Sequence, residues 1–81
     1  MDDAKQKTAE CYLLDLGLLL KEQAREAKMS ILNKSRSDDF ARGRLMAYHE
    51  VISLMKEQAI AFGLGLEDLN LHDIDPEKDL L

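Results

Sequence analysis

Residues 41–62 of the 81-residue chain read ARGRLMAYHEVISLMKEQAIAF and carry an unbroken series of apolar positions. These positions follow one another at alternating steps of four and three: Ala41, Leu45, Tyr48, Ile52, Met55, Ala59 and Phe62. This spacing keeps every member on one side of an α-helix and is typical of a helix packed lengthwise against another helix. The stretch therefore predicts a long helix over about 38–62 in an all-α protein.

A second helical pattern precedes it, over about residues 3–33. Its apolar face recurs at the helical period: Ala9, Leu13, Leu16, Leu20, Ala24, Ala27 and Ile31. Gly17 interrupts this helix at a cost of about 1 kcal/mol relative to Ala. We expect Gly17 to permit close approach of a neighbouring backbone, the alternative being that it is simply tolerated. The connection at 34–37 is short, which predicts an antiparallel two-helix hairpin.

A change of texture after the second helix predicts a short, irregular or part-helical C-terminal cap over 63–81. Gly63 is the residue expected for a left-handed helix C-cap. The pair Asp75-Pro76 is an N-cap followed by proline at the first helical position, which predicts a short final helical turn. We expect this tail to dock on the open end of the hairpin and to cover Leu14 and Leu18, using four apolar residues: Leu66, Leu69, Leu71 and Ile74.

Both long helices carry more apolar surface than one partner helix can cover. A single domain of this size buries only about 60–65% of its unfolded surface, so it needs additional stabilisation. Cys11 is the only cysteine, which excludes an internal disulfide. We therefore predict a homodimer in which two hairpins form a four-helix bundle. The predicted helix-packing and dimer seam comprises Leu14, Leu18, Leu45, Tyr48, Val51, Ile52, Leu54, Met55, Ala59 and Phe62.

The net charge of −5 argues against broad, non-specific binding to nucleic acid. The charge is uneven, however, because the middle of the chain is basic and the C-terminal part is acidic. Four basic residues gather around the connection between the helices and form a basic elbow: Lys34, Arg36, Arg42 and Arg44. The elbow is a candidate site for an anion or for nucleic-acid phosphates. The alternatives are that these residues contact an acidic protein partner or that they only solubilise the surface.

No residue pattern predicts catalysis, a cofactor or a metal. The paired glutamates fall on polar helix faces, and none has a histidine three residues later, as helical di-metal sites require. His49 has no oriented acid beside it, so we interpret it as a surface or interface residue. The acidic run from Asp68 to Asp75 lacks the glycine and the helical frame of a calcium loop.

We therefore expect a small non-enzymatic interaction or regulatory protein that acts as a helical homodimer and has an unidentified protein partner. The alternative function is a dimeric RNA- or DNA-binding regulator that uses the basic elbow. The acidic start of the chain does not fit a signal peptide, and no apolar run approaches the roughly 20 residues that cross a bilayer. A cytoplasmic protein without membrane contact is expected.

Overall fold

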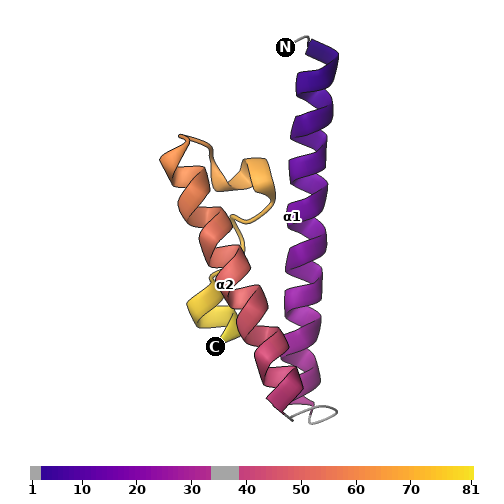
Figure 1. The fold of residues 1–81 in the computed structure, drawn as a ribbon, viewed down its shortest axis with the longest axis vertical. Coiled ribbons are helices and arrows are strands. Elements are labelled where there is room, and N and C mark those ends of the chain that lie inside the picture. The colour runs from indigo at the N-terminus through magenta and orange to yellow at the C-terminus, as the bar shows by residue number, and fades with distance from the viewer. Residues whose placement is uncertain (1–2, 34–38) are drawn as a thin grey trace.

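The computed structural model describes residues 3–33 and 39–81, and every regular element in these ranges is helical (Figure 1). Two long helices, α1 (Asp3–Leu32) and α2 (Asp39–Ala61), are followed by a 3₁₀ turn, η1 (Leu66–Leu69), and a single wide helical turn, η2 (Pro76–Leu80). The predicted all-α class is confirmed. The predicted connection at 34–37 lies outside the described residues.

The two long helices pack against each other as a hairpin whose arms diverge away from the connection (Figure 1). Alanines form the contact where the arms are close: Ala24 and Ala27 of α1 and Ala41 of α2 are all buried. Because alanine has the smallest side chain that still favours a helix, it lets two helix backbones approach. Farther along, η1 lies between the arms and fills the widening space.

The C-terminal segment supplies most of the large core side chains. Three of the four largest fully buried side chains belong to it, namely Leu71, Ile74 and Leu80, and the fourth is Ile52 of α2. Leu69 is also buried, and Leu66 is half-buried against the same cluster. The tail is therefore part of the core itself, and not only the cap that the sequence predicts.

The tail lies on a face of α2 that the sequence indicates to be polar. His49, Ser53 and Lys56 are half-buried there. The Lys56 ammonium donates a hydrogen bond to the carbonyl oxygen of Ile74. Both ring nitrogens of His49 are buried and have no hydrogen-bond partner among residues 3–33 and 39–81. His49, interpreted from the sequence as a surface or interface residue, is half-buried on this face. The physical reason is that the apolar side of the tail requires a face to cover, and long lysine stems can line one.

Two glycines have the roles that their positions predict. Gly63 has a φ of +73°, and the hydrogen bonds from Gly63 N to Ile60 O and from Leu64 N to Ala59 O complete a Schellman cap. Gly17 is buried against the carbonyl group of Leu69, and a Cβ atom at this position would lie 1.7 Å from that oxygen. Gly17 thus permits the close backbone approach that was expected of it.

A buried lysine ties the tail to α1. The Lys21 side chain is only 5% exposed, and its ammonium lies 2.7 Å from Asp73 Oδ1 and 2.7 Å from the carbonyl oxygen of Asn70. The hydrogen bond from Lys21 holds the pKa of Asp73 below its ordinary value of 3.8. Arg25 reinforces the contact by donating to the carbonyl oxygen of Asp73. The position of the tail is therefore fixed by polar contacts as well as by burial.

Candidate functional site

Several large apolar side chains are exposed along one stripe of α2. We call it the open face and define it by Phe40, Ala47, Val51, Leu54 and Phe62. Phe40, Leu54 and Phe62 are 68%, 56% and 78% exposed, and Val51 is 42% exposed. Residues two positions apart on a helix lie about 160° apart around its axis. Leu54 is therefore on roughly the opposite side of α2 from Lys56, so the open face points away from the tail.

The predicted seam divides into a buried part and an exposed part. Leu45, Ile52 and Ala59 are buried in the core, and Tyr48 and Met55 are partly buried against it. The open-face members Val51, Leu54 and Phe62 are exposed in the single chain. Phe62 does not continue the core as the four-three spacing suggests, because α2 ends at Ala61 and η1, not α1, fills the space beside this end of the helix. The same stretch of sequence thus carries two adjoining apolar surfaces.

Leu14 and Leu18 lie on another side of the molecule. They remain 37% and 36% exposed, and they border a shallow depression that also involves Asn70 of the tail. The Asn70 side-chain nitrogen donates to the carbonyl oxygen of Leu14, but no apolar tail residue lies in this depression. The expectation that the tail covers these two leucines is therefore wrong. The large tail side chains enter the space between the helices instead.

An apolar groove of about 300 Å³ lies at the divergent end of the hairpin, beside the open face. All three parts of the fold contribute to it: Leu13 from α1, Leu54, Met55, Gln58 and Ala59 from α2, and Phe62, Leu64 and Leu69 from the segment that follows. Gln58 is the only polar residue among them. Such a lining suits an apolar side chain, and it offers no charged group that would orient a polar substrate.

The structure describes two of the four residues of the basic elbow, and these two lie on different sides of α2. Arg42 is exposed, and its guanidinium lies 3.9 Å from Asp39 Oδ1. Arg44 lies about 160° away around the helix, as the two-residue separation requires. Its guanidinium lies 5.2 Å from the centre of the Tyr48 ring. Lys34 and Arg36 are outside the described residues.

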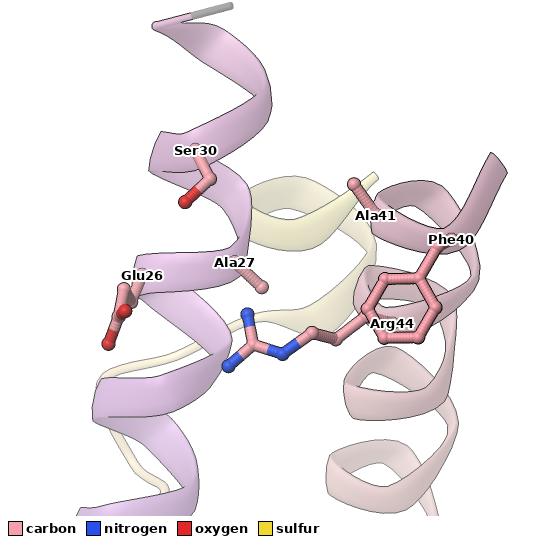
Figure 2. Close-up of a pocket in the computed structure, with 6 residues that line it drawn as sticks. All are labelled: Glu26, Ala27, Ser30, Phe40, Ala41 and Arg44. Atoms are coloured by element: carbon pink, nitrogen blue, oxygen red, sulfur yellow. The ribbon is translucent and has the colours of Figure 1, made fainter. Parts of the chain in front are cut away.

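Figure 2 shows how Arg44 is used. Its side chain extends from α2 towards α1, beside the Phe40 ring and towards Glu26, across a pocket of about 230 Å³. The adjacent Tyr48 hydroxyl donates a 2.6 Å hydrogen bond to Gln23 Oε1 of α1. Arg44 therefore contributes to the packing of the two helices and is not simply presented to solvent.

The tail carboxylates that resemble a cation loop serve as local caps and ties. Asp68 Oδ2 accepts a hydrogen bond from Gly65 N, and Asp75 Oδ1 accepts from the backbone amides of Glu77 and Lys78. The predicted N-cap at Asp75 before Pro76 is thereby confirmed. Within residues 3–33 and 39–81, no group of three His, Cys, Asp or Glu side chains is arranged to hold a metal ion.

Two contributors to these surfaces carry only weak signals in the sequence. Lys21 and Asp73 are separated by 52 residues, so no local pattern connects them. Phe40 stands one residue outside the main apolar series, although it belongs to the exposed stripe.

Among the described helices, none is long and apolar enough to cross a membrane. No protein-family model, curated protein or solved structure matches the chain.

Proposed function

We propose that this chain is a small non-enzymatic interaction or regulatory protein that acts as a helical homodimer. The observation that carries the proposal is the amount of surface that one chain leaves in solvent. The single chain exposes 5754 Å². A compact monomer of 9.2 kDa exposes about 4,900 Å² by the usual scaling of area with mass.

The shape of the chain agrees with this comparison. Its radius of gyration is 14.4 Å, and its extents are 48 × 21 × 18 Å. A compact domain of this length has a radius of gyration of about 12 Å. The surplus of roughly 800 Å² is about what each partner contributes to a standard protein–protein interface. The exposed N-terminal part of α1 contributes to the elongation (Figure 1), and a second copy packed along α2 would reduce the surplus area.

The chemistry of the exposed groups supports binding in preference to catalysis. The large exposed side chains of the open face are apolar, and the groove beside it has an almost entirely apolar lining. The polar groups in the interior hold the fold together: Lys21 pairs with Asp73, and Lys56 binds the backbone of Ile74. Surfaces of this kind bury apolar area against a partner.

Light scattering over a range of chain concentrations tests the proposal. We expect a mass of twice 9.2 kDa that decreases towards 9.2 kDa on dilution. A mass of 9.2 kDa at every concentration would contradict it. Addition of RNA at low and moderate salt tests the alternative function, a nucleic-acid-binding regulator. Binding of RNA by the basic elbow predicts an increase in mass that salt abolishes.

A further inference from the structure

The open face has a symmetry that predicts how two copies meet. Four of its five residues belong to a second series, one residue behind the buried series and at the same four-three steps: Phe40, Arg44, Ala47, Val51, Leu54, Gln58 and Ala61. The fifth, Phe62, directly follows the end of this series. A helix with two adjoining seams at this spacing contacts two neighbours. One neighbour is α1, and the second seam remains exposed in the single chain except at Arg44, which is half-buried towards α1.

Val51 lies at the centre of this second seam. Phe40 and Phe62 are each 11 residues from Val51, and Arg44 and Gln58 are each 7 residues from it. At 1.5 Å per residue, the two phenylalanines are about 16 Å from Val51 in opposite directions. If two such helices run antiparallel around a two-fold axis at Val51, each phenylalanine at one end meets the phenylalanine at the other end of the second copy.

We propose that the homodimer forms by antiparallel packing of α2 on α2 of a second copy, with the two-fold axis at Val51. The partner subunit's Phe40 then occupies the apolar groove that Leu13, Leu54 and Phe62 border. This proposal deepens the proposed function and rests on it.

The size of the groove fits this occupant. Its volume is about 300 Å³. An apolar cavity of about 150 Å³ accepts a benzene ring, so the groove has room for one aromatic side chain. Phe40 is 68% exposed at the far end of the stripe, where a second copy can take it up. The small residues Ala47 and Val51 at the centre let the two helix backbones approach.

Charge favours the antiparallel direction over the parallel one. A parallel pair would place Arg44 opposite the same arginine of the second copy, whereas the antiparallel pair places it opposite Gln58. Repulsion between the two copies of Arg44 therefore disfavours the parallel pair.

Engineered disulfides test this arrangement. In a Cys11→Ser background, which has no other cysteine, Arg44→Cys and Gln58→Cys are placed on separate chains that carry tags of different mass. We expect reductant-sensitive cross-links only when the two chains are mixed, because these two positions face each other across the axis. Cross-links within each chain type alone would show a parallel pair and would overturn the proposal.

Met46→Cys and Ile60→Cys are the matched control variants. Both positions are exposed on α2, outside the open face. We expect neither to cross-link, alone or mixed. If the Cys11→Ser chain is dimeric but only the control positions cross-link, or no position does, the assigned face is wrong and the homodimer stands. A monomeric Cys11→Ser chain would overturn both the homodimer and the antiparallel arrangement.

Phe40→Ala tests the occupant of the groove without a cysteine. We expect it to raise the dimer dissociation constant at least tenfold, about the loss expected when an aromatic anchor buried in a pocket is truncated. Ile60→Ala, which truncates a 71% exposed residue of the same helix, should leave the constant unchanged. Helicity measured by circular dichroism shows whether each variant folds. An unchanged constant for a folded Phe40→Ala chain would overturn this part of the proposal.

Discussion

Substitution of Gly17 by alanine should separate the tail from the hairpin. A Cβ atom at residue 17 would lie 1.7 Å from the carbonyl oxygen and 2.8 Å from the carbonyl carbon of Leu69. Ordinary contacts begin at 3.4 Å, so the η1 backbone would have to move by more than an ångström. The obstacle is backbone and not the flexible end of a side chain. Leu69 and Leu71 are buried, and a movement of this size would loosen their packing.

Two effects of opposite sign set the change in unfolding free energy that Gly17→Ala causes. Replacing a helix-interior glycine by alanine stabilises the helix by about 1 kcal/mol. Overpacking of a tight site costs about 1–3 kcal/mol, and we take the upper end because backbone must move. The net expectation is a loss of about 2 kcal/mol of unfolding free energy. For a domain of this size, such a loss lowers Tm by about 8–16 °C.

Gly43→Ala is the matched control, because it makes the same substitution inside α2. A Cβ atom at residue 43 has no neighbour within 4 Å, so only the gain in helix propensity remains. Thermal unfolding followed by circular dichroism, at one fixed chain concentration, compares the two variants. We expect Tm to rise for Gly43→Ala and to fall for Gly17→Ala. A rise of Tm in both would refute the close contact between α1 and the tail.

Three further predictions concern the docking of the tail. Because Leu71 is fully buried, Leu71→Ala should lower the free energy of unfolding, measured by chemical denaturation, by about 2–5 kcal/mol. Leu64→Ala, at a 43% exposed position, should lower it far less. Equal losses would contradict the assignment of Leu71 to the core. Lys21→Ala should lower the free energy of unfolding by about 2 kcal/mol, because charge-assisted hydrogen bonds are lost. Arg25→Ala removes a half-exposed side chain and should lower it little. The reverse order would show that Arg25 holds the tail. The pKa of Asp73 is lower in the folded protein than its ordinary value of 3.8, so the ionised carboxylate stabilises the fold. This stabilisation is fully present above pH 3.8 and is lost as the pH falls through the pKa of the folded protein, so Asp73→Asn should flatten the acid limb of a Tm-against-pH curve. An identical acid limb in both proteins would argue against this linkage.

Local signals in the sequence predict much of this fold. The four-three spacing places α2, and Gly63 and the pair Asp75-Pro76 mark a helix end and a helix start through their own backbone chemistry. The place of the tail depends on contacts between residues some 50 positions apart, such as Lys21 with Asp73, and no local pattern encodes them. For the same reason, a pattern of polar residues could not show that the tail binds this face of α2 through Lys56 and Ile74.

The candidate surface was predicted in part. The excess apolar residues of α2 follow from helical spacing alone, and spacing alone also places Arg42 and Arg44 on opposite sides of the helix. Spacing did not show which excess residues the tail would cover. Leu14 and Leu18 were assigned to the same seam as Val51, and the structure places them beside Asn70 instead.

The most direct test of the homodimer on the open face is the solution mass of two charge variants. Leu54→Glu places a carboxylate on the open face, where residue 54 is 56% exposed, and Ile60→Glu places one outside it, where residue 60 is 71% exposed. By light scattering at a concentration where the unmodified chain is dimeric, we predict a helical monomer for Leu54→Glu and a dimer for Ile60→Glu. A dimer for Leu54→Glu, or a monomer for Ile60→Glu, would contradict the assignment of the open face as the dimer interface.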